Sequence, residues 1–191
     1  GNTYNNSDNC TNNNPCNGSE GTASTIKTYI DNWYNTNLKS YEDKIANGDY
    51  CNDTSYSNYR ETENVRYYGA YDRITSSAIN PVLLCADTSV NYGGKYKLKV
   101  GLLTADEIAL AGYNTKIAST TNNSYLEKDF LWWSFTPNDS DINTWARVFY
   151  AESRLSSYYT KNSSDVRPVI NLKADTQVTS GNGTSSNPYV V

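Results

Sequence analysis

The 191-residue chain contains no histidine and no methionine. Without histidine, Ser-His-Asp and Cys-His catalytic sites and metal sites with imidazole ligands are excluded. Without methionine there is no natural start, so we expect Gly1 to result from processing or cloning. No run approaches the roughly 18 apolar residues of a membrane span, and we expect this segment not to insert into a membrane.

Charge is also sparse, because Asp, Glu, Lys and Arg make up 19% of the residues and the net charge is −4. A net negative charge argues against nucleic acid or an anionic membrane as the partner. Tyrosine, in contrast, occurs 18 times. It supplies apolar area together with a polar tip, so the chain can build a core with few aliphatic residues. A surface rich in Tyr, Asn and Ser is typical of extracellular recognition by stacking and hydrogen bonding.

Four cysteines, Cys10, Cys16, Cys51 and Cys85, allow three disulfide pairings. None stands in a CxxC motif, so a structural zinc site is not expected. For an extracellular protein we favour Cys51–Cys85, with Cys10–Cys16 closing a short local loop. The alternative is four reduced, buried thiols in a cytosolic protein.

The chain length and the absence of a long linker indicate one domain, covering residues 23–191, after an N-terminal coil over residues 1–22. Ser24 or Thr25 is expected to cap a helix with Ile26, Ile30, Trp33 and Tyr34 on one face. A second short helix, ending near Gly48, is predicted from the spacing of Leu38, Tyr41 and Ile45. Residues 49–96 give little signal beyond a short buried extended piece at residues 80–85.

Residues 130–137 form the densest aromatic run and predict a buried strand. Residues 146–150 and 166–172 are also strand-like, and the three segments are expected to form one antiparallel sheet. Alternation over residues 96–103 predicts a half-buried strand with Tyr96 on the buried side. A capping box at Thr104 predicts a helix over residues 105–111. Asp106 and Glu107 lie in its first turn, where we expect them to stabilise the positive end of the helix dipole rather than to act in acid–base catalysis.

Four segments occur in an order that resembles a known family: STIK-x-x-I-x-x-x-Y at 24–34, VGLLT-x-DE at 100–107, WWS-x-TP at 132–137 and DVRPVINL at 165–172. They resemble an uncharacterised domain of Gram-positive gut-bacterial surface proteins, itself similar to the formylglycine-generating-enzyme-like branch of the C-type-lectin-like fold. The resemblance implies an α+β, C-type-lectin-like domain over residues 23–191. It would have two helices packed on twisted antiparallel sheets, long irregular loops presenting a ligand face, and termini close together. Residues 188–191 would then form a closing strand paired with the N-terminal side of the domain.

The sequence departs from the active members of that fold. The formylglycine-generating relatives need reactive cysteines in their C-terminal part, and this chain has no thiol after Cys85. The Glu-Pro-Asn and Trp-Asn-Asp motifs of calcium-dependent lectins are absent. The nearest metal candidate is Asp139-x-Asp141-x-Asn143, but Thr144 stands where a calcium loop needs glycine, so we interpret it as a polar turn. No cofactor is expected.

The favoured function is a non-enzymatic extracellular binding module, adhesin-like or pilus-associated, at a bacterial cell surface or secreted. Loops around residues 113–125 and 138–164 would present a face rich in Tyr, Asn and Ser to a protein or glycan ligand. The candidate ligand-binding residues are Asn143, Trp145, Arg147, Tyr158 and Tyr159; at least one of the adjacent tyrosines should face outward. Arg147 and Arg167 could each bind an anionic ligand or form a structural pair with an acid or with carbonyl groups.

Three alternatives stay open. Residues 138–164 suit a target-binding surface diversified by a retroelement. A carboxylate-dependent glycan hydrolase would need two convergent acids among Asp129, Asp139, Asp141 and Glu152. A structural subunit of a surface filament, with homo-assembly through a sheet edge, is the third.

Overall fold

The computed structural model describes residues 2–3, 24–62, 65–75, 78–85, 94–113, 126, 130–141, 147–152, 154–184 and 186–191. For residues 2, 3, 56, 58–62, 65, 66, 140, 141 and 147 it describes the backbone alone. Its helices and antiparallel sheets confirm the predicted α+β class.

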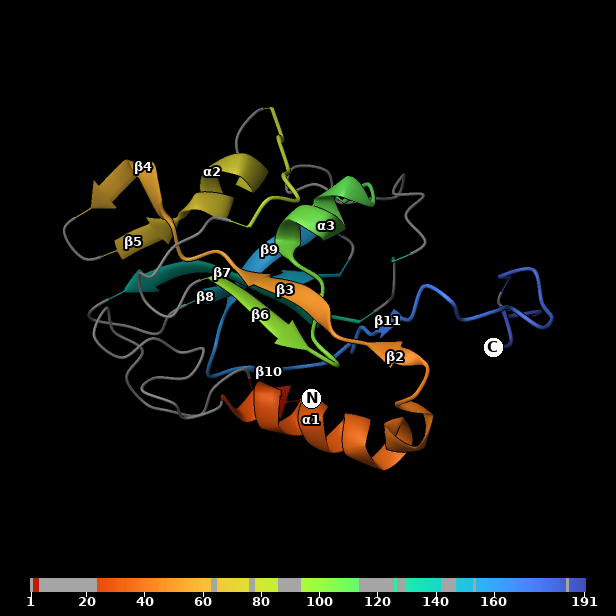
Figure 1. Cartoon of the computed structure of the whole chain (residues 1–191). Helices are drawn as coiled ribbons and strands as arrows, with labels where there is room; N and C mark the ends of the chain where they lie inside the picture. The colour runs from red at the N-terminus through yellow and green to blue at the C-terminus, as the bar shows by residue number, and fades with distance from the viewer. Residues whose placement is uncertain are drawn as a thin grey trace.

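A five-stranded antiparallel sheet with strand order β4-β5-β7-β8-β9 forms the centre of the molecule (Figure 1). Its strands are β4 (Tyr56–Thr62), β5 (Val65–Tyr68), β7 (Trp132–Asp141), β8 (Arg147–Ala151) and β9 (Leu155–Tyr159). The predicted pairing of residues 130–137 with 146–150 is confirmed as β7 and β8. The register shifts on both sides of Pro137, which lacks the N–H that a regular ladder requires.

Trp132 and Trp133 anchor two separate cores on opposite faces of this sheet. Neighbouring strand residues point to opposite faces, and here both faces are covered, so both indoles are 0% exposed. Trp132 packs with Phe149 beneath α2 (Gly69–Thr75) and α3 (Ala105–Leu110). Trp133 packs with Val148 against α1 (Thr25–Asn37), and Figure 1 shows α1 on the side opposite α2 and α3. The buried strand predicted from the aromatic run is therefore confirmed.

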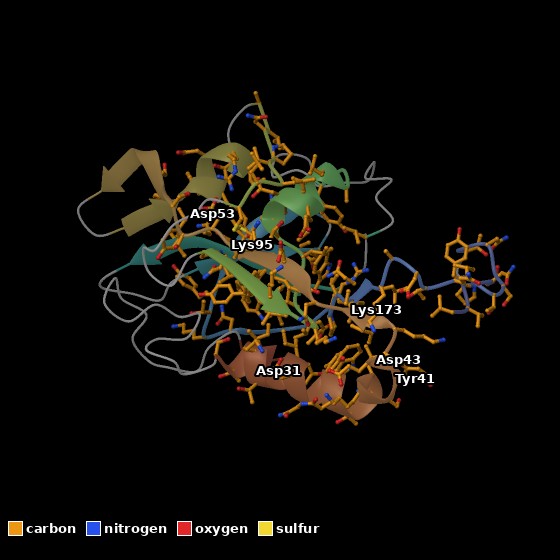
Figure 2. The ribbon with its side chains drawn as sticks, viewed as in Figure 1. Asp31, Tyr41, Asp43, Asp53, Lys95 and Lys173 are labelled. Atoms are coloured by element: carbon orange, nitrogen blue, oxygen red, sulfur yellow. A yellow bond between two sulfur atoms is a disulfide. The ribbon has the colours of Figure 1, made fainter. Side chains whose placement is uncertain are left out.

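The caps predicted from sequence fix the starts of two helices. The Ser24 side chain accepts a hydrogen bond from the Lys27 N–H at 3.2 Å, and α1 buries Ile26, Ile30 and Tyr34. Thr104 and Glu107 form the predicted capping box of α3. Figure 2 shows Asp31, Tyr41 and Asp43 along α1 and the turn after it, on the side away from Asp53.

The prediction of a second helix ending near Gly48 was wrong. Only a 3-10 turn, η1 (Lys39–Tyr41), forms, and strand β2 (Ile45–Ala46) follows it. Ile45 enters the α1 core with 1% exposure, so the chain has to turn back toward the sheet. Helix α2 lies within residues 49–96, where no helix was predicted.

The prediction that residues 166–172 complete the sheet was also wrong, because β9 takes the place beside β8. From 166–172 only Asn171–Leu172 forms a strand, β11, which pairs with β2, while Val169 makes an isolated bridge to Gly101. Pro168 lacks a ladder donor and explains this interruption. Residues 155–159, expected within a contact loop, are thus sheet.

A separate two-stranded sheet joins β3 (Gly48–Asn52) to β6 (Gly94–Leu98). The strand predicted over 96–103 ends at Leu98, and Tyr96 is exposed rather than buried. Tyr96 lies opposite Tyr50 in register, and it is the Tyr50 ring that occupies the buried space of this layer, edge-on to Phe135.

The two ends of the chain do not pair with each other as expected. Strand β1 (Asn2–Thr3), within the predicted coil, pairs with β10 (Ser163–Ser164). Residues 188–191 do not reach it, because Val190 bridges to Ser180 in a C-terminal hairpin that extends from the body beyond β11 (Figure 1). The described helices include none that is both long and apolar enough to cross a membrane.

Candidate functional site

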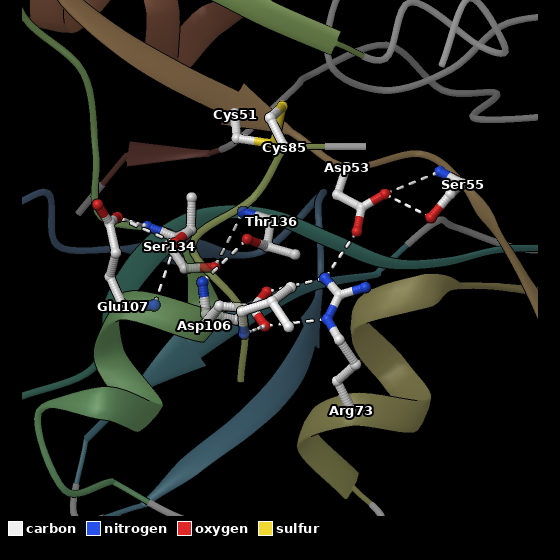
Figure 3. A network of polar contacts seen from close by, with 12 residues as sticks. Cys51, Asp53, Ser55, Arg73, Cys85, Asp106, Glu107, Ser134 and Thr136 are labelled. Atoms are coloured by element: carbon white, nitrogen blue, oxygen red, sulfur yellow. Dashed lines mark hydrogen bonds and ion pairs between the residues drawn. A yellow bond between two sulfur atoms is a disulfide. The ribbon is translucent and has the colours of Figure 1, made fainter. Parts of the chain in front are cut away.

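A buried ion-pair network joins α2 and α3 to the end of β3 (Figure 3). The Arg73 guanidinium contacts both carboxylate oxygens of Asp106, through Nε at 3.0 Å and a terminal nitrogen at 2.9 Å. The same terminal nitrogen lies 2.6 Å from the Asp53 carboxylate. Asp53 also accepts a hydrogen bond from the Ser55 N–H at 3.0 Å. Asp53 and Asp106 are both buried, so one arginine balances two carboxylates inside the protein.

Arg73 is held firmly in its charged form. Burial acts to lower its pKa, but the hydrogen bonds to Asp106 and Asp53 outweigh burial and the pKa is raised overall. The Arg73 guanidinium therefore stays charged near neutral pH and joins the two helices to the end of β3 as a fixed structural contact.

The network also fixes a loop that carries exposed apolar side chains. The Val82 N–H donates to Asp106 at 2.9 Å, and the Asn80 N–H donates to the Arg73 carbonyl at 2.9 Å. Cys85 forms the predicted disulfide with Cys51, with the two Cα atoms 5.4 Å apart. Residues 80–85 are thus held at three points.

Between these anchors, Leu83 and Leu84 project into solvent with 73% and 86% of their surface exposed. We call this pair the leucine tip. The sequence predicted a buried extended piece at residues 80–85, and for these two side chains that prediction was wrong. The backbone is pulled toward Asp106 and Cys51, which leaves the leucines on the outer side.

A groove of about 110 Å³ runs beneath the leucine tip. Its lining includes Leu83 and Leu84 of the leucine tip together with Leu103, Glu107 and Tyr50. This volume accommodates a side chain rather than a whole ligand, since pockets that enclose drug-sized molecules measure roughly 300–1,000 Å³. The lining of the groove is largely polar and includes Asp49, Glu107 and Asn171, so the apolar contact surface at this place is the leucine tip itself.

Tyr50 fixes the floor of the groove. Its hydroxyl donates to the Val169 carbonyl at 2.7 Å and accepts from the Asn171 amide at 3.2 Å. Gly101 allows the ring to lie close, because a Cβ at that position would come within 2.3 Å of it. Burial, opposed by the Asn171 hydrogen bond and aided by Glu107, raises the Tyr50 pKa to about 12.

Tyr50 is expected to make the protein less stable in alkali. The unfolded chain releases this proton near the ordinary pKa of about 10, whereas the folded chain retains it up to about 12. The unfolded state therefore binds fewer protons in this window, so the Tyr50 contribution is complete below about pH 10 and declines above it. Urea unfolding at pH 8 and pH 11 will measure the decline.

The matched variant is Tyr50→Phe, which keeps the ring. It is expected to cost about 1 kcal/mol at pH 8 for the lost hydrogen bonds and to show a smaller loss of stability between pH 8 and pH 11 than the wild type. Equal pH dependence in the two proteins would contradict the role given to Tyr50.

Of the five predicted ligand-binding residues, the structure describes the side chains of Tyr158 and Tyr159. Tyr158 packs against Trp133 and Tyr150, with ring centroids 6.0 and 5.7 Å apart, so it belongs to the core. Tyr159 does face outward, as expected for one of the pair, beside the ammonium of Lys161. Asn143 and Trp145 lie outside the described residues, and for Arg147 only the backbone in β8 is described.

The proposed metal turn at 139–143 is a strand as far as Asp141. Asp139 and Asp141 belong to β7 and pair with Tyr67 and Val65 of β5. Within the described part of the chain, no three His, Cys, Asp or Glu residues gather as a metal site would require. Asn143 lies outside that part.

The other charged residues considered from the sequence have different outcomes. Arg167 was expected either to bind an anionic ligand or to form a structural pair, and the structure shows a structural pair. Its guanidinium donates to the Leu126 carbonyl at 2.6 Å and lies 4.7 Å from the Trp132 ring. Of the first-turn acids of α3, Glu107 closes the capping box as predicted, whereas Asp106 binds Arg73. Of the acids considered for a hydrolase, Asp139 is buried within β7, Glu152 follows β8, and Asp129 lies outside the described residues.

Sequence reasoning missed both the network and the leucine tip. The signal that was present is the pair Leu83-Leu84 directly before a cysteine predicted to form a disulfide. The partners of Arg73 carried no local signal. Comparison of the chain with protein-family models, with curated proteins and with solved structures found no match, so its function has to be inferred from this geometry.

Proposed function

We propose that this chain is a non-enzymatic extracellular binding module that engages a protein ligand through the leucine tip. The observation that carries the proposal is the exposure of Leu83 and Leu84, at 73% and 86%, on a loop fixed by the disulfide and by Asp106. Contiguous apolar side chains exposed on the surface mark interaction sites when they form a patch, and here two adjacent leucines are exposed together.

The energetics favour association. Burying one leucine side chain is worth about 1.5–3 kcal/mol, and binding normally loses part of such a gain to the ordering of the loop. Here the hydrogen bond from Val82 and the Cys51–Cys85 bridge have ordered the loop beforehand. Aliphatic side chains select an apolar protein surface over a glycan, which is bound mainly through hydrogen bonds and aromatic faces.

Two further observations support the other parts of the proposal. A disulfide persists in oxidising compartments, which suits a bacterial cell-surface or secreted location. The acids nearest the groove are engaged structurally, Asp53 and Asp106 by Arg73 and Glu107 by Thr104, which suits binding rather than acid–base catalysis. The membership of the C-type-lectin-like fold, and of the surface-protein family within it, is part of the same proposal and is supported by the α+β layering and the antiparallel sheets.

The double variant Leu83→Ser/Leu84→Ser tests the proposed function. Arrays of purified host and bacterial surface proteins, probed with the wild-type domain, will supply the ligand. The double variant is expected to weaken binding to that ligand by at least about 100-fold, equivalent to the loss of two buried leucines. Its unfolding free energy should change by less than about 0.5 kcal/mol, because both residues are exposed.

Leu110→Ser is the matched control, since Leu110 is an exposed leucine at the end of α3 and does not line the groove. It should bind like the wild type. Unchanged binding by the double variant would refute the proposal. Self-association that the double variant abolishes would instead assign the leucine tip to contacts between copies, and the filament subunit would become the better function.

A further inference from the structure

A second hollow lies on the face of the large sheet that carries α2, and it shares no wall residue with the groove. Its volume is about 170 Å³. Tyr71 and Thr75 of α2 form one wall, and Phe149 with Leu155 forms apolar surface on the sheet side. Four polar or charged residues complete the lining, namely Asn138, Arg154, Ser156 and Ser157.

Asn138 is the least expected residue of this hollow. It is 2% exposed, yet its side chain has a single hydrogen bond within the described part of the chain, from Nδ2 to the Asp139 carboxylate. That bond assigns the nitrogen and leaves the Oδ1 acceptor without a described partner. Asn138 lines the hollow, so this acceptor is available to a ligand that carries a hydrogen-bond donor.

The other polar groups are also available. Ser156, Ser157 and Arg154 make no side-chain hydrogen bond or ion pair with the described residues. Arg154 directly precedes β9, whose second and third residues are Ser156 and Ser157. Ser157 pairs with Phe149 and shares its face of the sheet, whereas Ser156 pairs with Tyr150 and its side chain points to the opposite face. The hollow therefore offers an acceptor, one hydroxyl group and a guanidinium.

The aromatic wall is rigid. The Tyr71 ring packs on Tyr67 with centroids 4.1 Å apart and an angle of 37° between the planes. Thr75 donates to the Tyr71 carbonyl at 2.6 Å, one turn along the helix. Such a held ring gives a flat surface for the C–H face of a ligand at little entropic cost.

We infer that this hollow binds an acidic sugar, a hydroxylated ring that carries a carboxylate, as one unit of a glycan. The Arg154 fork pairs with the carboxylate, Ser157 and Asn138 Oδ1 bind ring hydroxyls, and the ring face covers Tyr71. A simple anion carries no donor for the Asn138 acceptor and would use Arg154 alone. A neutral sugar leaves Arg154 unused, and the volume suits one ring rather than a larger ligand.

The test is a titration of the ¹⁵N-labelled domain with methyl glucuronide and with methyl glucoside, which differ in the carboxylate. The amide signals of Ser156 and Ser157 are the readout. The glucuronide is expected to shift them saturably, with an affinity at least about tenfold above that of the glucoside. Arg154→Gln should reduce the glucuronide affinity to that of the glucoside and leave the glucoside affinity unchanged.

Three controls make the outcome decisive. Lys161→Gln removes an exposed cation outside the hollow and should have no effect. Leu83→Ser/Leu84→Ser should retain glucuronide binding, so that failure here and failure of the proposed function are distinguishable. Sulfate shifting the same signals as strongly as the glucuronide, an unchanged glucuronide affinity in Arg154→Gln, or no saturable shift would each overturn the inference.

Discussion

Replacing Arg73 by methionine is expected to lower the free energy of unfolding by about 3–5 kcal/mol. Methionine keeps much of the apolar length of the side chain but removes the charge that Asp53 and Asp106 share. Both carboxylates would then stay buried without a cation, and removal of one partner from a buried ion pair costs more than the pair itself contributes. Urea unfolding of the two proteins at pH 7 will measure the difference.

The effect should depend on the carboxylates and not on Arg73 alone. Adding Asp53→Asn and Asp106→Asn to Arg73→Met is therefore expected to restore part of the lost stability, because neutral amides no longer need a cation. Lys95→Met is the matched control; it removes an exposed cation 3.7 Å from Asp49 and should cost less than about 1 kcal/mol. An Arg73→Met protein as stable as the Lys95→Met protein would contradict the account of the network.

The same network shows which parts of the site the sequence could not predict. Arg73 lies 20 residues from Asp53 and 33 from Asp106, and no local pattern joins positions at such separations. Asp106 also stands in the first turn of α3, where a carboxylate is favourable without any partner. The interpretation that both acids stabilise the start of α3 was sufficient for Glu107. For Asp106 it gave no reason to expect the ion pair with Arg73.

The parts that were predictable have short-range causes. Ser24 and Thr104 were identified as caps because their hydrogen bonds reach only three residues along the chain. Trp132 and Trp133 were assigned to the interior because a continuous aromatic run suits a strand covered on both faces. The segment 155–159 was missed because its serines and tyrosines also suit loops, and its pairing with β8 depends on a hairpin that composition does not encode.

The leucine tip was misjudged for a different reason. An apolar pair next to a cysteine usually indicates burial. Here the Cys51–Cys85 bridge and the Val82–Asp106 hydrogen bond hold the backbone, and the side chains are left outside. Exposure of Leu83 and Leu84 is therefore a consequence of long-range contacts, and those contacts are also what makes the pair a suitable binding element.

Removing the disulfide is consequently expected to affect both stability and binding. Cys51 and Cys85 are separated by 34 positions, and closing a loop of that length reduces the entropy of the unfolded chain by an amount worth about 4 kcal/mol. The variant Cys51→Ser/Cys85→Ser should lose stability of that order in urea unfolding. In the folded state, Cys85 would no longer tie the C-terminal end of the loop, whereas Asp106 would still hold Val82.

The expected functional result is a partial loss of preorganisation. Amide hydrogen exchange at Leu83 and Leu84 should become faster, and affinity for the protein ligand should fall, though less than in Leu83→Ser/Leu84→Ser, because both leucines remain. Cys10→Ser/Cys16→Ser is the matched control: it removes two cysteines far from the loop in sequence and should leave exchange at Leu83 and Leu84 unchanged. Equal exchange with and without the Cys51–Cys85 bridge would mean that the hydrogen bond to Asp106 alone fixes the loop, and the disulfide would then contribute stability without contributing to recognition.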